Sequence, residues 1–183
     1  MKHVPSVFRT LPAALTLSLV LAACSGNDPV KLTQSAKDYM AKSDHAAAII
    51  QLKNALQAKP DMAEARFLLA KALLATGDVS GAQTELKKAQ DAGYAPEQIV
   101  PLMARVMLSQ GESKKLTDTY AETKLSDPES QAELLTMVSA AWLAQGKPDQ
   151  ARATLADALK AQPNHVPALI LQARITASGK DID

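Results

Sequence analysis

Side chains that commonly do chemistry are scarce in this chain of 183 residues. It has a single cysteine, Cys24, and its three histidines include His45 and His165, which lie outside any pattern of carboxylates or thiols typical of a metal site. The nucleophile motifs G-x-S-x-G, S-x-x-K and H-E-x-x-H are absent, and the glycines form no phosphate-binding loop. The sequence therefore predicts no catalytic residue, no metal and no cofactor, and it indicates a protein that is not an enzyme.

The one cysteine stands in a context that suggests covalent modification. A short stretch with Lys2, Arg9 and no acidic residue precedes an apolar run, residues 11–23, which is too short for an ordinary membrane-spanning helix and is typical of a secretory signal. The segment LAAC that ends at Cys24 resembles the bacterial lipobox, which implies cleavage before Cys24 and covalent lipid on it. Ser25, in place of Asp, resembles the pattern of lipoproteins sent to the outer membrane. The alternative is an ordinary secretory signal with a chance cysteine.

These features predict how the mature chain is anchored and where it is. Removal of the signal peptide, residues 1–23, would take two of the 20 basic residues and leave 18 against 19 acidic ones. A nearly neutral protein is not a general nucleic-acid binder. We therefore expect a lipidated tether at residues 24–29 and a lipid-anchored protein of the bacterial cell envelope, in the outer membrane and facing the periplasm.

The remainder of the chain has the composition and periodicity of helices with an Ala and Leu core. The full sequence is 47% hydrophobic, only 3% aromatic and 21% charged. Apolar residues recur three and four apart, and turn signals recur 34 or 35 residues apart. These hairpin corners are Ser43-Asp44, Gly77-Asp78, Gly111-Glu112 and Gly146-Lys147. The sequence therefore predicts a repeated pair of antiparallel helices.

Small residues recur at the same spacing, and two helices can approach closely only where side chains are short. In the first helices of the pairs these positions hold Ala36, Ala70, Ala104, Ser139 and Ala173, and in the second helices Ala48, Ala82 and Ala151. A further small position, expected to seat each second helix against the next pair, holds Ala55, Ala89, Thr123 and Ala158.

With these positions the chain resembles the tetratricopeptide repeat family. The resemblance implies an all-α, right-handed solenoid of four repeats over residues 30–165, followed by residues 166–183 as the first helix of a fifth repeat or a cap. The repeats are expected at about 29–62, 63–96, 97–131 and 132–165. The departures are Leu116 where a small residue is usual, Tyr94 where proline is usual and Ser35 at an apolar position, so the second and third repeats are expected to sit at altered angles.

Two longer runs, AAIIQLKNALQAKPDMAEARFLLAKALLATGD and AGYAPEQIVPLMARVMLSQGE, resemble the N-terminal region of the tetratricopeptide lipoproteins of the PEP-CTERM/exosortase system. This resemblance implies an envelope-anchored scaffold for protein–protein interactions in exopolysaccharide production or export. It also implies a longer array, so we expect the natural protein to continue beyond this chain. The alternative is an accessory lipoprotein for outer-membrane protein or type IV pilus assembly. Nothing in the sequence supports an enzyme.

In this family the first helices line the concave surface. The ninth position of successive repeats is basic in four cases of five, beside an apolar strip. The candidate partner-binding residues are Lys37, Lys71, Arg105, Arg174, Phe67 and Thr33. A cationic row suits an acidic peptide segment, a C-terminal carboxylate or an anionic polysaccharide of the envelope. The alternative is that these are ordinary solvated lysines and arginines.

Overall fold

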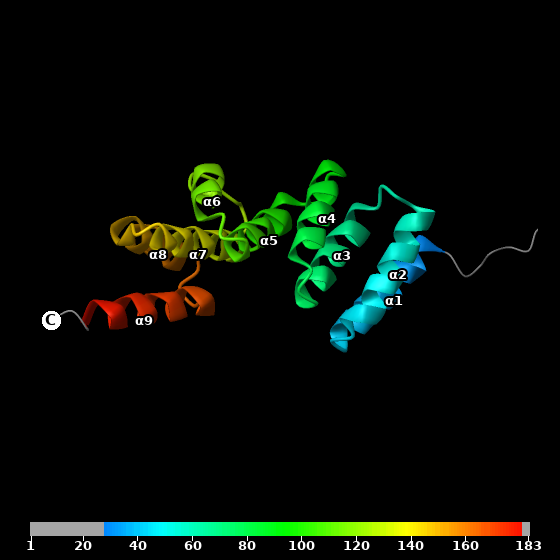
Figure 1. The fold of residues 1–183 in the computed structure, drawn as a ribbon, viewed down its shortest axis with the longest axis horizontal. Coiled ribbons are helices and arrows are strands. Elements are labelled where there is room, and N and C mark those ends of the chain that lie inside the picture. Colours follow the sequence, from blue (N-terminus) through cyan, green and yellow to red (C-terminus); the bar gives the residue numbers. More distant parts are fainter. Residues whose placement is uncertain (1–27, 181–183) are drawn as a thin grey trace, which may run out of the picture.

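Antiparallel helical hairpins follow one another along the molecule, as the repeat spacing predicts (Figure 1). The computed structural model describes residues 28–180, and these form nine helices and no strand. The four hairpins are α1 (Pro29–Ala41) with α2 (His45–Ala58), α3 (Ala63–Ala75) with α4 (Val79–Asp91), α5 (Pro96–Ser109) with α6 (Ser113–Tyr120), and α7 (Pro128–Ala144) with α8 (Pro148–Ala161), followed by α9 (Val166–Lys180). The predicted all-α repeat architecture is confirmed.

The predicted signal peptide and Cys24 lie outside the described residues. The predicted tether is too long at one end, because Pro29 is already the first residue of α1 and Asp28 caps that helix by accepting a hydrogen bond from the Val30 amide. None of the described helices is both long and apolar enough to cross a membrane.

Local sequence explains where the helices begin and where the hairpins turn. The side chains of Asp44, Asp78 and Asp127 accept hydrogen bonds from backbone amides in the first turns of α2, α4 and α7. The corners need a residue with positive φ, which glycine adopts without strain. Gly77, Gly111 and Gly146 have φ of 85°, 74° and 71°, whereas the first corner holds Ser43 at φ 60°.

The small residues lie where the two helices of each hairpin cross. The first-helix members Ala36, Ala70, Ala104 and Ser139 and the second-helix members Ala48, Ala82 and Ala151 are all 0% exposed. Ser139 keeps its hydroxyl satisfied by donating to the Ala151 carbonyl oxygen at 2.8 Å. The burial predicted for these small residues is therefore confirmed in both helices of the first, second and fourth hairpins and in the first helix of the third.

The third hairpin departs from the others. Leu116, fully buried, occupies the crossing position of α6, and the bulk of its side chain prevents the close approach that alanine allows. The helix ends at Tyr120, and α6 packs mainly on α7 of the next hairpin. The expectation that Thr123 seats this second helix is therefore wrong, because Thr123 lies in the irregular segment after the helix. A cleft of about 590 Å³ lies beside this segment, lined also by Trp142 and by α8.

The last helix, α9, has no second helix over it among the described residues. Leu169 and Ile170 are 41% and 49% exposed, and Ala173, predicted to lie at a close helix crossing, is also exposed. Ala168 and Ile175 face α7 and α8 and are buried. The face of α9 that corresponds to the crossing face of the other first helices is thus uncovered.

Candidate functional site

First helices line a groove of about 370 Å³, which we call the first-helix groove. Only residues of α3, α5 and α7 contribute to it. They are Phe67 and Lys71 from α3, Glu97, Gln98, Pro101, Leu102 and Arg105 from α5, and Glu129, Ser130 and Glu133 from α7. The groove lies where the family resemblance places the partner-binding surface.

Aromatic rings fix one end of the first-helix groove. The rings of Phe67 and Tyr94 stack with centroids 4.5 Å apart and an interplanar angle of 21°. The Lys71 ammonium lies 5.7 Å from the centroid of the Phe67 ring, within the range of a cation–π contact. The Tyr94 hydroxyl donates to Gln98 Oε1 at 3.1 Å, and burial, with the Glu64 carboxylate nearby, raises the pKa of Tyr94 and keeps it protonated.

Tyr94 stands at the junction between the second and third hairpins, where its departure from the family pattern predicts an altered angle. It follows Gly93, whose φ of 81° turns the chain after α4. The helix α5 packs on α4 and has little contact with α3, and the stacked ring of Tyr94 fills the space beside Phe67 instead. The groove is therefore opened at the junction between the second and third hairpins.

Two of the four basic residues of the predicted cationic row are paired with carboxylates of the next repeat. Lys37 Nζ lies 2.7 Å from Glu64 Oε1, and Arg105 is ion-paired with Glu133. Lys71 is different, because no carboxylate of the described residues lies within ion-pairing distance of it. The row carries less positive charge than its sequence predicts.

Two members of the predicted binding set have little accessible surface. Thr33 is 2% exposed, and its hydroxyl donates to the Pro29 carbonyl oxygen at 2.7 Å, so its prediction as a partner-binding residue is wrong. Phe67 is 6% exposed, lines the groove and stacks on Tyr94. Arg174 lies on α9, outside the first-helix groove, and is exposed.

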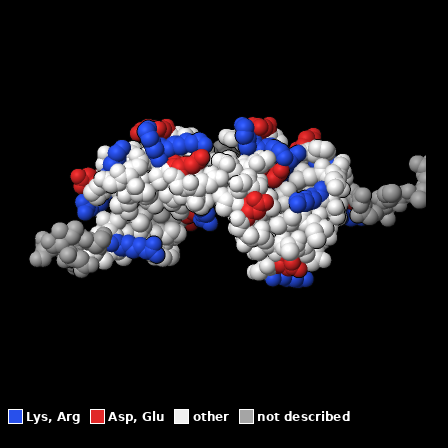
Figure 2. Space-filling view, viewed as in Figure 1, with Lys and Arg blue, Asp and Glu red and all other residues white. Residues whose placement is uncertain are grey.

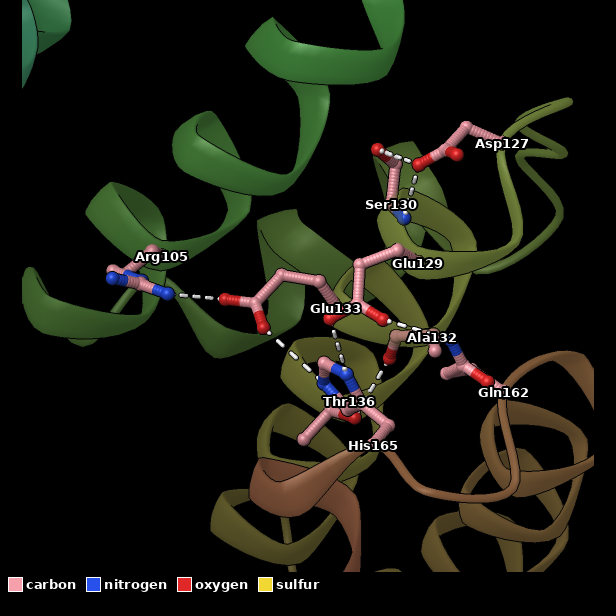
Figure 3. A network of polar contacts seen from close by, with 9 residues as sticks. All are labelled: Arg105, Asp127, Glu129, Ser130, Ala132, Glu133, Thr136, Gln162 and His165. Carbon is pink, nitrogen blue, oxygen red and sulfur yellow. Dashed lines mark hydrogen bonds and ion pairs between the residues drawn. The ribbon is translucent and has the colours of Figure 1, made fainter.

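A polar network beside the groove joins three successive first helices (Figure 3). Glu133 of α7 pairs with Arg105 of α5, and its other carboxylate oxygen lies 3.3 Å from Nε2 of His165 without the alignment of a hydrogen bond. The other ring nitrogen of His165, Nδ1, lies 3.1 Å from Glu129 Oε1. Gln162 donates to Glu129 at 3.1 Å. His165, which is 3% exposed, thus links α9 to both carboxylates of α7.

The carboxylates that pair with the basic row, Glu64 and Glu133, were not predicted from the sequence, although their positions carry a signal. Glu64 and Glu133 both occupy the second position of a repeat, directly across from the basic residue of the repeat before. A periodic search for acidic residues, like the one made for basic residues, finds them. The role of His165 had no such signal, because the other repeats have no histidine at the corresponding position.

The array of hairpins with a groove along its first helices is typical of helical repeat proteins that bind other proteins. Two stretches of the chain identify which repeat this is. Residues 39–106 and residues 141–183 match family models of the tetratricopeptide repeat. The chain is therefore built of tetratricopeptide repeats, a module that binds proteins and peptides. No curated protein matches it in sequence.

Solved structures of similar fold include tetratricopeptide proteins. The crystal structure of MamA is 22% identical, with a TM-score of 0.69, and the match covers 78% of this chain and 82% of MamA. PilF of Pseudomonas aeruginosa is 18% identical, with a TM-score of 0.68 over 85% of this chain and 71% of PilF. YrrB, described as having an unusual peptide-binding site, is 14% identical, with a TM-score of 0.52 over 81% of this chain and 94% of YrrB. At these identities the likeness concerns the fold alone.

Proposed function

We propose that this chain is an envelope-anchored scaffold that binds an extended segment of a partner protein, and that it acts in PEP-CTERM/exosortase-linked exopolysaccharide production or export. The observation that carries the binding role is the first-helix groove, which combines an apolar floor with charged walls. Such a groove holds a peptide through side-chain pockets and fixes its direction through charge.

The lipid anchor on Cys24 and the outer-membrane location rest on the sequence resemblance to a lipobox. Mass spectrometry of the mature N-terminal peptide tests the anchor. Diacylglycerol and an acyl chain on Cys24 support the anchor, and an unmodified thiol on the exported protein excludes it.

The binding role is tested by filling the groove. Leu102 is half-buried on α5 and lines the groove, so the indole of Leu102→Trp should occupy part of the space for a peptide. The matched control is Gln57→Trp, which adds the same ring at an exposed position of the second helix α2. Partner capture from a detergent extract should fall with Leu102→Trp and persist with Gln57→Trp. Equal capture by both variants would exclude the groove.

The same capture experiment distinguishes the two candidate roles. Polysaccharide-export or exosortase components among the captured proteins support the first role. Barrel-assembly components or pilus secretin subunits support the alternative, an accessory lipoprotein for outer-membrane protein or pilus assembly. The likeness in fold to PilF favours keeping this alternative.

A further inference from the structure

The first-helix groove has more acidic than basic side chains. Its lining includes Lys71 and Arg105 on one hand and Glu97, Glu129 and Glu133 on the other. Basic and acidic side chains are also interspersed on the face of the molecule in Figure 2, without a large patch of one sign. The net charge of the groove lining is therefore opposite to that expected from the predicted cationic row.

The charges that attract a ligand most are those that have no ion-pair partner within the protein. Arg105 and Glu133 neutralise each other, and the Glu133 side chain is only 17% exposed. Neither Glu97 nor Glu129 has a Lys or Arg partner among the described residues. Both carboxylates stand at the α5–α7 end of the groove, and the ammonium of Lys71 stands at the α3 end.

The contacts of Glu97 and Glu129 orient these carboxylates and leave them capacity to bind. Ser126 donates to Glu97 Oε1 at 2.8 Å, and hydrogen bonding from the backbone and from Ser126 lowers the pKa of Glu97. The Glu129 side chain is 62% exposed although it contacts His165 and Gln162. A carboxylate accepts about four hydrogen bonds, so each retains acceptor sites for an incoming cation.

We infer that the ligand of the first-helix groove is a bipolar peptide. An arginine or lysine side chain lies against Glu97 and Glu129, and an acidic side chain lies against Lys71. A helix with its side chains is about 10–12 Å wide, so the axes of α3, which carries Lys71, and α7, which carries Glu129, are about 20 Å apart with α5 between them. At about 3.3 Å per residue of extended chain, the two charges are about six residues apart. This inference rests on the proposed peptide-binding function and replaces an acidic ligand with one that carries both charges.

The test uses the full chain and three pools of fluorescein-labelled twelve-residue peptides, randomised except at two fixed positions six residues apart. One pool has Asp and Arg at these positions, one has Asp at both and one has Ser at both. Fluorescence anisotropy should show the Asp and Arg pool binding about two- to fivefold more tightly than either other pool, the range expected for one partly exposed ion pair.

Substitutions assign the preference to its residues. Glu97→Gln should remove most of the advantage of the Asp and Arg pool without touching His165, and Glu129→Lys should favour the Asp and Asp pool. Asp118→Asn is a matched control, since Asp118 lies on α6 outside the groove and pairs with Lys114. Circular dichroism confirms that each variant is folded.

The outcomes separate this inference from the function on which it rests. Tightest binding of the Asp and Asp pool, abolished by Leu102→Trp, would overturn the bipolar ligand and retain the groove as a peptide site. Binding that is indifferent to Leu102→Trp, or no binding by any pool, would overturn both.

Discussion

The stack of Phe67 on Tyr94 offers the most direct test of how the groove is built. Double-mutant cycles with leucine at one or both positions keep apolar bulk and remove the ring–ring contact. An aromatic pair in offset geometry contributes about 0.5–1.5 kcal/mol beyond the area that it buries. The centroid separation of 4.5 Å, the angle of 21° and the 6% exposure of Phe67 fit such a pair, so a coupling of about 1 kcal/mol is expected.

Urea unfolding measures this coupling, provided that the four proteins share one m-value. A change in m would indicate that the repeats no longer unfold together, which arrays of this kind permit. Tyr94→Phe is the matched control, because it retains the stacked ring and removes the hydroxyl that donates to Gln98. It should change the free energy of unfolding by less than about half of the coupling.

A coupling below about 0.2 kcal/mol, with a constant m-value, would refute the stacked arrangement. It would also remove the explanation for the small contact between α3 and α5, because the Tyr94 ring is taken to fill the space between these helices. The groove would then have no fixed floor at its Lys71 end.

Two further predictions concern the helix ends. Ser43→Gly should stabilise the first hairpin by about 0.5–1 kcal/mol, because the left-handed conformation at φ 60° strains serine more than the extra chain entropy of glycine costs. Gly111→Ser should destabilise the third hairpin by a similar amount. Urea midpoints measure both changes, and hydrogen exchange assigns the first to α1 and α2 and the second to α5 and α6. Hydrogen bonds from the Ser130 hydroxyl and amide lower the pKa of Asp127, so its stabilising contribution is complete above the pKa of the unfolded chain and disappears as the pH falls through the lower folded value. The stability difference between wild type and Asp127→Ala should therefore shrink on acidification, and a constant difference would contradict this cap.

The parts of the fold that sequence predicts well are those set by short-range constraints. Ala70 and Ala82 lie at a crossing because only short side chains fit there, and Gly77 lies at a corner because its φ is positive. Both requirements recur with the repeat and can be counted. Leu116 is an exception to the spacing of small residues. The sequence therefore indicates that the third hairpin departs from the repeat pattern, but it does not show that α6 ends at Tyr120.

The charge of the groove was harder to predict because it depends on pairs between repeats. Lys37 and Arg105 look like a cationic row when one helix position is examined alone. Their partners Glu64 and Glu133 come from the following repeat, and the resulting ion pairs change the charge presented to a ligand. A single column of a repeat alignment therefore predicts which side chains face the groove more reliably than the charge that they present.

The departures from repeat regularity are also what shape the groove. Because α6 ends early, the irregular segment after it brings Ser126 to Glu97, and Gln131 holds that segment by accepting a hydrogen bond from the Leu125 amide at 2.5 Å. Tyr94, in place of proline, opens the other end of the groove. A regular array would have neither feature, so the bipolar ligand inferred above depends on the junctions around the third repeat. Restoring a regular α6 should therefore alter the preference for a ligand with a basic residue next to Glu97, even though α6 itself does not line the groove.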